Sequence, residues 1–349
     1  MSAFNANRIA AMTLLTIYMP SKRSLAGSRD AIESALAYAE RVDAKLVVSD
    51  NSGDMEKRGW LEGRSPRLHV VVSNAESAAD NWRPAFDHVD TPFLLPMGDD
   101  DLVSFREDEE APDLAALPAD VIGLRPVTQI WTLNDGVRQT ERFPLTEPTP
   151  GGRFFEYSRK ARGNNSSYYS IFRAEPFLSL MRLFVDFHPT KGGYIDWAIC
   201  LALFASGRLL HDPSLIYRYD LGRWAESESL RQTKTKLFTE VGLPEDAEKF
   251  WGLLLFLDLY VLLARLPLDA DAQQDANIAS YQMFLKPFLN GVAETPERFD
   301  ETTRYIAELV AAEQQLDSIF QLSIYLSDCI KPGLKDAYVR FYQAALAAR

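Results

Sequence analysis

The sequence predicts an α/β protein with a mostly parallel, doubly wound sheet, followed by a purely α-helical C-terminal region. In the first hundred residues, short apolar runs alternate with segments of helical periodicity, as in parallel sheets covered by helices. From about Glu226 onward, no segment has the pattern of a strand. Helical patterns separated by prolines are expected there, at approximately 228–241, 246–266, 272–291, 297–329 and 333–347.

The first half of the sheet is predicted from four apolar runs. They lie at Met12–Met19, Lys45–Ser49, Arg67–Val72 and Phe93–Met97. Helices are expected between them at Ser28–Val42, whose apolar residues recur at helical spacing, and at about Glu76–His88. Because the strands are parallel, the loops that follow them should emerge at the same edge of the sheet.

The next hundred residues have a more mixed pattern. Val121–Leu133 and Val137–Phe143 are expected to form a hairpin around the turn Asn134-Asp-Gly136. Pro144–Gly152 is rich in proline and glycine and is predicted to be a loop. A strand at Ser167–Arg173, a helix after Ala174, a helix at about Asp196–Ser206 and a strand at Arg208–Tyr219 should follow.

The composition excludes several classes of function. The 349 residues carry a formal net charge of −12, which disfavours nonspecific binding to nucleic acid or anionic membranes. The histidines are few and widely spaced, so a histidine-rich zinc site is not expected. Cys200 and Cys329 lie far apart in apolar helical contexts, which indicates core residues and not a disulfide.

No secretory signal or membrane-spanning segment is predicted. The longest apolar stretch, Phe250–Ala264, is interrupted by Asp258 and is shorter than the roughly 20 residues that cross a bilayer. The N-terminus has no pattern of a signal peptide. We therefore expect a cytoplasmic protein, with the inner face of the membrane as a second expected location.

Three consecutive carboxylates are the most informative feature of the chain. Asp99, Asp100 and Asp101 follow Gly98 directly after the apolar run that ends at Met97. Such dense negative charge repels itself unless a cation lies among the groups, and Mg²⁺ and Mn²⁺ prefer oxygen ligands. The cluster therefore predicts a metal site for a phosphorylated substrate, with a solvated acidic turn as the alternative.

Two further loops should reach the same edge of the sheet. Pro20–Arg23 follows the first strand and Asp50–Gly53 follows the second, with the 73–83 segment close by. Asp50 and Asn51 have donors and acceptors suited to a nucleobase or a ribose, although an ordinary Asx turn that caps the next helix is the alternative. Arg23 and the preceding lysine could reach a diphosphate. Neither a dinucleotide-binding glycine motif nor a P-loop follows the first strand.

This ordered set of motifs resembles the family 2 glycosyltransferases, which have the GT-A fold. The matching segments are Thr16-Ile-Tyr-Met-Pro20-Ser-Lys-Arg23, Val47-Val-Ser-Asp50, Val72-Ser-Asn74 with Asp80-Asn81-Trp82, and Phe93 to Asp101. Further along, Ser166–Arg173 resembles the strand that lines the acceptor pocket. Tyr194-Ile-Asp196-Trp197 resembles the family's acidic motif at the start of a helix.

The resemblance implies a domain division. A GT-A, Rossmann-like domain would occupy residues 1–225, with a donor half at about 12–103 and an acceptor half at about 104–225. Residues 226–349 would form the α-helical C-terminal domain, to which the resemblance does not extend.

The resemblance also implies roles for individual residues. Asp196 would be the general base, with a helix N-cap as its alternative role. Asp50 would bind the base of the nucleotide sugar, and the donor site as a whole would comprise Pro20, Ser21, Arg23, Asp50, Asn51, Asn81 and Asp99. The metal would be held by Asp100 and Asp101.

The sequence departs from the family pattern at two places. Gly98 stands where many members have the first Asp of the Asp-x-Asp metal motif, so the assignment of roles among the three aspartates is open. The histidine that often follows the closing strand is missing. Asp220 or Arg223 would replace it, or fewer protein groups would hold the metal.

We therefore expect a Mn²⁺- or Mg²⁺-dependent, inverting glycosyltransferase of the hexosyltransferase type. It would transfer a sugar from a nucleotide sugar to a hydroxyl of a glycan or glycoconjugate, in bacterial surface polysaccharide synthesis. The expected partners include a membrane surface and, through the helical region, a second copy of the chain. The alternatives are a sugar-nucleotidyltransferase and a non-catalytic nucleotide-sugar-binding scaffold. A double displacement with Asp186 as second carboxylate also stays open.

Overall fold

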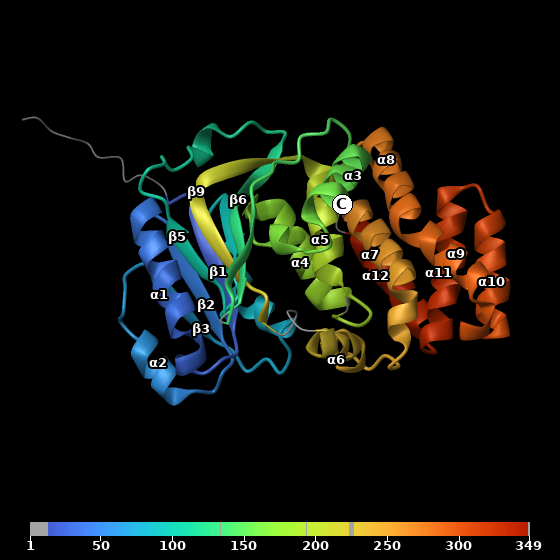
Figure 1. Ribbon diagram of the computed structural model, residues 1–349, viewed down its shortest axis with the longest axis horizontal. Helices are drawn as coiled ribbons and strands as arrows, with labels where there is room; N and C mark the ends of the chain where they lie inside the picture. Colours follow the sequence, from blue (N-terminus) through green and yellow to red (C-terminus); the bar gives the residue numbers. More distant parts are fainter. Residues whose placement is uncertain (1–12, 133, 193, 223–226, 348–349) are drawn as a thin grey trace, which may run out of the picture.

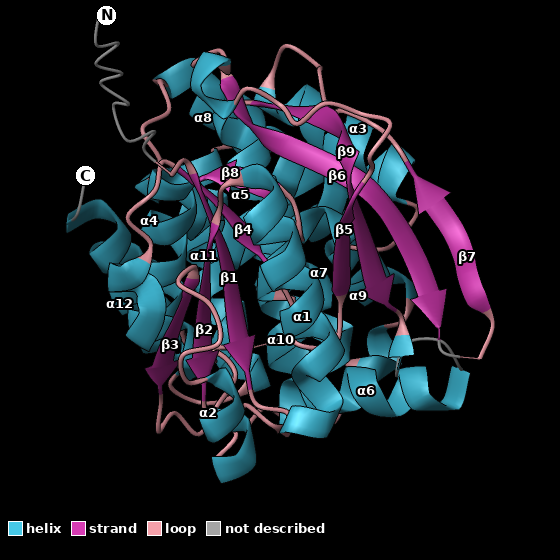
Figure 2. Ribbon diagram, turned by 90° about the vertical axis from the view of Figure 1, so that its left-hand side faces the viewer, coloured by secondary structure: helices cyan, strands magenta, loops and turns pink. Residues whose placement is uncertain are grey.

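A single mixed sheet forms the centre of the α/β part (Figures 1 and 2). The computed structural model describes residues 13–132, 134–192, 194–222 and 227–347. In these ranges the strand order is β3-β2-β1-β4-β8-β6-β9-β5, and β7 pairs with β6. The strands are β1 (Leu15–Ser21), β2 (Lys45–Asp50), β3 (Leu68–Val72), β4 (Phe93–Pro96), β5 (Leu102–Phe105), β6 (Val121–Thr132), β7 (Gly136–Glu141), β8 (Ile171–Arg173) and β9 (Arg208–Asp220).

The four N-terminal strands are parallel, as the sequence predicts. β1 pairs with β2 and β4, and β2 pairs with β3, all in parallel register. β1, β2 and β4 are buried along almost their whole length, which explains their continuous apolar runs. Ser21 at the end of β1 is paired with Asp50 at the end of β2. The loops after these two strands therefore start side by side.

The second half of the sheet mixes the two strand directions. β8 is antiparallel to both β4 and β6, whereas β6 and β9 are parallel, and β5 and β7 pair in antiparallel fashion with β9 and β6. Gly123 in β6 allows β8 to approach closely. A Cβ atom there would lie 2.1 Å from the carbonyl oxygen of Ile171.

Two layers of helices cover the sheet (Figure 1). α1 (Leu25–Val42) and the short α2 (Met55–Leu61) lie on one side. α4 (Ala174–Phe187), α5 (Ile195–Ser206) and the helical region lie on the other. The segment predicted as a helix at Glu76–His88 is instead a 3-10 helix, η1 (Asp80–His88), with Pro84 inside it.

Two predictions of elements were confirmed only in part. The expected loop at Pro144–Gly152 contains the start of helix α3 (Pro150–Ala161), since Thr149 caps it and proline is favourable in a first turn. The expected strand at Ser167–Arg173 is formed only over β8, after a 3-10 turn, η3 (Ser166–Tyr168). Two further elements, α2 and β5, are too short to give a periodic pattern.

The helical region contains more breaks than its prolines predict. It comprises α6 (Ser227–Thr239), α7 (Trp251–Arg265), α8 (Ala270–Ser280), a π-helical turn (Tyr281–Leu285), α9 (Lys286–Glu294), α10 (Glu301–Ala312), α11 (Leu316–Ile330) and α12 (Leu334–Ala347). The single helix expected at 297–329 is therefore two. Its break carries Glu313, whose carboxylate accepts the N–H groups of Gln314 and Gln315 and so ends the helical ladder.

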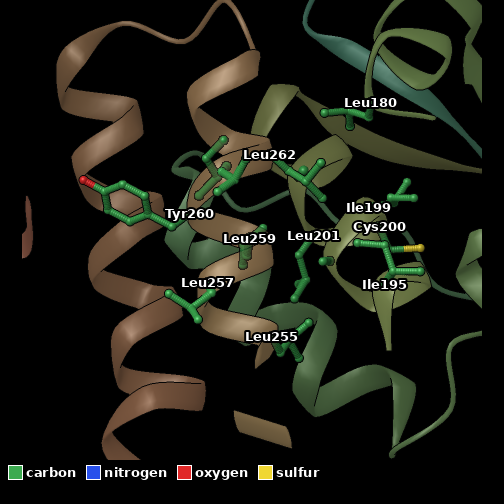
Figure 3. Close-up of a cluster of buried hydrophobic side chains, with 14 of the residues drawn as sticks. Leu180, Ile195, Ile199, Cys200, Leu201, Leu255, Leu257, Leu259, Tyr260 and Leu262 are labelled. Carbon is green, nitrogen blue, oxygen red and sulfur yellow. The ribbon is translucent and has the colours of Figure 1, made fainter. Parts of the chain in front are cut away.

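One hydrophobic core joins the helical region to the α/β part. It extends from the sheet through α4 and α5 into α7 and α12. α5 and α7 are buried nearly all round, which fits their uniformly apolar sequences. Figure 3 shows part of this core, in which Leu255 and Leu259 of α7 lie close to Leu201 of α5, whereas Tyr260 points away from α5. None of the described helices is long and apolar enough to span a membrane.

Candidate functional site

The three carboxylates of the acidic cluster have different partners. Asp99 fastens the loop that follows β1. Its Oδ2 accepts the hydroxyl of Ser21 at 2.8 Å and the backbone N–H groups of Lys22 and Arg23 at 3.0 Å each. Its Oδ1 lies 3.2 Å from Nε of Arg23. The structure therefore brings Ser21, Arg23 and Asp99 together, and places Pro20 in the strand directly before them.

Asp100 is the carboxylate that faces solvent. Its side chain is 37% exposed, compared with 13% for Asp99. Its described ion-pair partner is Arg23, which bridges the two aspartates and is itself half-exposed. An incoming ligand would therefore meet Asp100 and Arg23 at the surface of the cluster.

Asp101 points inward and ties the cluster to β9. It is buried, and its two oxygens accept the hydroxyl of Tyr217 at 2.7 Å and the N–H of Asp220 at 2.8 Å. Burial and the neighbouring charge of Asp100 raise the pKa of Asp101 to about 7. Asp220, expected as a substitute for the missing histidine, thus contacts the cluster through its backbone. Arg223, the other expected substitute, lies outside the described residues.

Gly98 is explained by the crowding of this turn. A Cβ atom at position 98 would lie 2.7 Å from Oδ2 of Asp101 and 2.9 Å from Oδ1 of Asp100. A side chain there would have to displace both carboxylates. Glycine at position 98 is therefore favoured by the way the next three residues fold.

The cluster suits a cation that is shared with a substrate. No group of three or more His, Cys, Asp or Glu side chains able to hold a metal occurs in the described part of the chain. However, Oδ1 of Asp100 and Oδ2 of Asp101 both lie within 3 Å of the position that a Cβ atom of residue 98 would take, so the two carboxylates face the same side of the turn. Mg²⁺ is commonly held by one or two carboxylates together with substrate phosphates. These two aspartates fit that pattern. The described residues do not form a complete metal site made of protein ligands alone.

Asp50 is buried below the acidic cluster in an ion pair that the sequence does not reveal. Its Oδ1 lies 3.0 Å from Nζ of Lys57, and both side chains are almost fully buried. Lys57 also donates to the hydroxyl of Ser21 at 2.6 Å and to the carbonyl of Arg23 at 2.9 Å. Nothing in the pattern around Lys57 distinguishes it from a surface lysine. Asp50 does form an Asx turn, because its Oδ1 accepts the N–H of Ser52 at 3.3 Å, but the N-cap of α2 is Asp54, so the capping part of that alternative was wrong.

Asn51 and Asn81 form one hydrogen-bonded unit beside Asp50. The Asn81 amide donates to the carbonyl of Ser49 at 2.8 Å and to Oδ1 of Asn51 at 2.9 Å. Asn51 in turn donates to the carbonyl of Ala75 at 2.8 Å. This unit fixes the 73–75 segment, so the two asparagines predicted for the donor site do lie together.

An open pocket of about 460 Å³ lies between the 73–84 segment and the 185–191 segment. Two ion pairs cross it, Lys191 with Asp80 at 2.7 Å and Arg83 with Asp186. Its lining comprises Ser73, Asn74, Ala75, Asp80, Arg83, Pro84, Val185, Asp186 and Lys191. The sequence pointed to the 73–83 segment and to Asp186, but not to the charge pairs between them.

Asp196 lies in the first turn of α5. The N-cap of that helix is Tyr194, so the alternative role of Asp196 as an N-cap was wrong. Its Oδ2 accepts the Asn165 amide at 2.9 Å, and Asn165 is itself fixed by the hydroxyl of Tyr157 at 2.8 Å. Burial raises the pKa of Asp196, while the Asn165 hydrogen bond opposes part of that rise.

The segment 165–169 connects Asp196 with the acidic cluster. Asn165 at its start contacts Asp196. At its end, Tyr169 stacks on Tyr217 with ring centroids 4.9 Å apart, and Tyr217 donates to Asp101. A buried pair that the sequence did not single out, Arg125 with Glu141, supports this segment through Ser166 and Ser167.

These features define a fold class, a GT-A-like α/β sheet with an attached helical region, as the sequence predicts. The structure is similar to that of S. aureus TarS residues 1–349, with a TM-score of 0.50 and 14% identity over 97% of this chain and 92% of that chain. No protein-family model matches the sequence, and no curated protein matches it.

Two further solved structures are more distantly similar. S. aureus TarS 1–349 in complex with UDP-GlcNAc has a TM-score of 0.48 and 14% identity, over 96% of this chain and 91% of that chain. The mannosyltransferase PcManGT from Pyrobaculum calidifontis, in complex with GDP-Man and Mn²⁺, has a TM-score of 0.40 and 14% identity. That match covers 92% of this chain and 87% of the other. At such identities, the likeness establishes the fold alone.

Proposed function

We propose that the protein is an inverting glycosyltransferase that transfers a hexose from a nucleoside-diphosphate sugar to an acceptor hydroxyl. Its acceptor would be a glycan or glycoconjugate of a bacterial surface polysaccharide pathway. The observation that carries the proposal is the segment 165–169. It links a half-buried carboxylate, Asp196, to an acidic cluster beside an arginine, in a fold similar to that of TarS.

Asp196 would take the proton of the acceptor hydroxyl. A hydroxyl is a weak nucleophile at neutral pH, so a base must remove its proton as the attack proceeds. Burial raises the pKa of Asp196, which makes its carboxylate a stronger base than an exposed one. Asn165 holds one carboxylate oxygen and leaves the other to face the acceptor. A single base of this kind matches direct displacement, with inversion at the anomeric carbon.

The acidic cluster would bind the diphosphate end of the donor. Asp100 and Asp101 would hold Mn²⁺ or Mg²⁺, which when bound neutralises charge on the leaving diphosphate. Arg23, fixed by Asp99 and Asp100, would lie beside the same group. Asp50, Asn51 and Asn81 would shape the nucleoside end, with Lys57 fixing the carboxylate of Asp50.

The test is turnover of a panel of UDP- and GDP-sugars with MnCl₂, against the same panel with EDTA. Asp196→Asn should lower the transfer rate by roughly 10²–10⁴-fold and leave nucleotide binding intact, whereas Asp100→Asn should weaken nucleotide binding in the presence of Mn²⁺. Asp120→Asn is the matched control, since that carboxylate pairs with Arg208 on the surface. Transfer at the wild-type rate by the Asp196 variant would exclude it as the base.

Product stereochemistry separates the two displacement mechanisms. NMR of the first product formed should show the anomer opposite to that of the donor. Retention, together with loss of transfer in Asp186→Asn, would replace the proposal by a double displacement. Binding of nucleotide sugars without any turnover would favour the alternative of a non-catalytic nucleotide-sugar-binding scaffold.

A further inference from the structure

We propose that the helical region positions the segment leading into Asp196, through a buried hydrogen-bond relay from Asp258 to His188. Asp258 lies in the middle of the apolar helix α7 and is buried. Its Oδ1 lies 2.9 Å from Nε2 of His188 and accepts the hydroxyl of Tyr338, on α12, at 2.9 Å. The relay thus joins two helices of the C-terminal region to the end of α4.

The other nitrogen of His188 holds the turn that follows α4. Nδ1 accepts the backbone N–H groups of Thr190 at 3.3 Å and of Lys191 at 2.9 Å. Since Nδ1 acts as acceptor twice, the ring proton is on Nε2 and is donated to Asp258. Asp258 therefore fixes both the tautomer and the orientation of the imidazole that organises this turn.

Lys191 shows that the turn is held in a demanding conformation. Its φ is 55°, in the left-handed region that residues other than glycine rarely adopt. Two interactions hold it there, the N–H bond to His188 and the ion pair of its Nζ with Asp80 across the pocket. Backbone strain of this kind persists where the surroundings determine the geometry.

Direct packing also holds Gly192 and Tyr194, described residues between this turn and Asp196. Tyr194, two residues before Asp196, places its ring edge-on against Phe238 of α6 and Trp251 of α7, with centroids 5.8 and 5.6 Å away. A Cβ atom at Gly192 would lie 2.3 Å from Val241. Only a cavity of about 10 Å³ remains between this turn and the helices. In such close packing, a shift of the helices would move the turn.

The test measures hydrogen exchange at the backbone amides of Thr190 and Lys191. His188→Gln keeps a donor toward Asp258 but has no acceptor at the place of Nδ1, so exchange of both amides should become roughly fivefold faster or more. His188→Asn, whose amide oxygen can replace Nδ1, should restore much of the protection. Tyr260→Phe is the matched control, because it removes a hydrogen bond from the same helix to Asp317 on α11.

The hydrogen-exchange result tests whether the relay holds the turn, independently of any catalytic activity. Unchanged exchange in His188→Gln, or an equal rise in Tyr260→Phe, would overturn the proposal.

The effect on catalysis rests on the proposed function. With a donor that the wild type turns over, His188→Gln should lower kcat about tenfold, by misplacing Asp196, and leave the affinity for UDP within about twofold. Loss of UDP affinity with unchanged kcat would contradict this role. If the wild type turns over no donor, the proposed function fails, and the exchange result still decides the relay.

Discussion

Removal of the Lys57 ammonium is the sharpest test of how the donor edge is held together. Lys57 and Asp50 are an ion pair with almost no exposure to solvent. Methionine is close to lysine in length and fills the same channel, so Lys57→Met removes the charge without opening a large cavity. The substitution leaves the carboxylate of Asp50 buried beside the backbone N–H of Ser52 at 3.3 Å, without its cation.

The expected loss is large because three acceptors depend on one ammonium. Besides Asp50, the hydroxyl of Ser21 and the carbonyl of Arg23 lose a donor at 2.6 and 2.9 Å. Breaking a buried ion pair by removing one partner costs about 3–5 kcal/mol. We therefore expect the free energy of unfolding to fall by about that amount. Asp50→Asn together with Lys57→Met should recover about 1–3 kcal/mol, because no unpaired charge is then left.

Urea denaturation followed by tryptophan fluorescence gives the required free energies. Lys22→Met is the matched control, since that neighbouring lysine is exposed and donates to a backbone carbonyl at 3.2 Å, and its midpoint should stay close to that of the wild type. A loss below about 1 kcal/mol in Lys57→Met, or strictly additive effects in the double variant, would refute the reasoning from burial.

Three further predictions concern single residues. Asn165→Ala removes a hydrogen bond that favours the charged form of Asp196, so its pKa, already raised by burial, should rise further. Activity should then be lost at a higher pH as the medium is acidified, and an unmoved acid limb of the kcat/KM profile would contradict this. Gly98→Ala should weaken UDP binding with Mn²⁺ roughly tenfold in calorimetry, since its Cβ displaces the two carboxylates; an unchanged Kd would refute the steric argument. Gly123→Ala, with a Cβ 2.1 Å from the Ile171 carbonyl, should cost about 1–3 kcal/mol in thermal unfolding, and full stability would contradict the close strand approach.

The N-terminal sheet could be predicted because three of its four strands, β1, β2 and β4, are buried along almost their whole length. A continuous apolar run is then the only requirement, and the parallel pairing follows from the helices between the strands. The meeting of the loops after β1, β2 and β4 follows from the same topology. Elements whose boundaries depend on a few residues were predicted less accurately. α3 begins at Thr149-Pro150, a capping signal within a stretch otherwise typical of a loop.

The partners of buried charges could not be predicted, because they come from distant parts of the chain. Asp258 interrupts an apolar helix, and the sequence gives no sign that His188, 70 residues away, completes it. Lys57 is likewise buried where Ser21, at the end of β1, and Arg23, in the loop that follows, supply two oxygen acceptors. A charged residue is stable inside a protein only when paired, so its place is decided by tertiary contacts that local pattern does not encode.

The acidic cluster shows how tertiary contacts give three identical side chains different roles. Asp99 is satisfied by the loop after β1, and Asp101 by Tyr217 and the backbone of β9. Each of these two ties the turn to one half of the sheet. Asp100, between them, has Arg23 as its described side-chain partner and is the most exposed of the three. A ligand that approaches the edge of the sheet can therefore bind Asp100 without breaking a contact that holds the two halves together. Asp99 and Asp101 keep their own contacts, and so stay in place, while the site is filled.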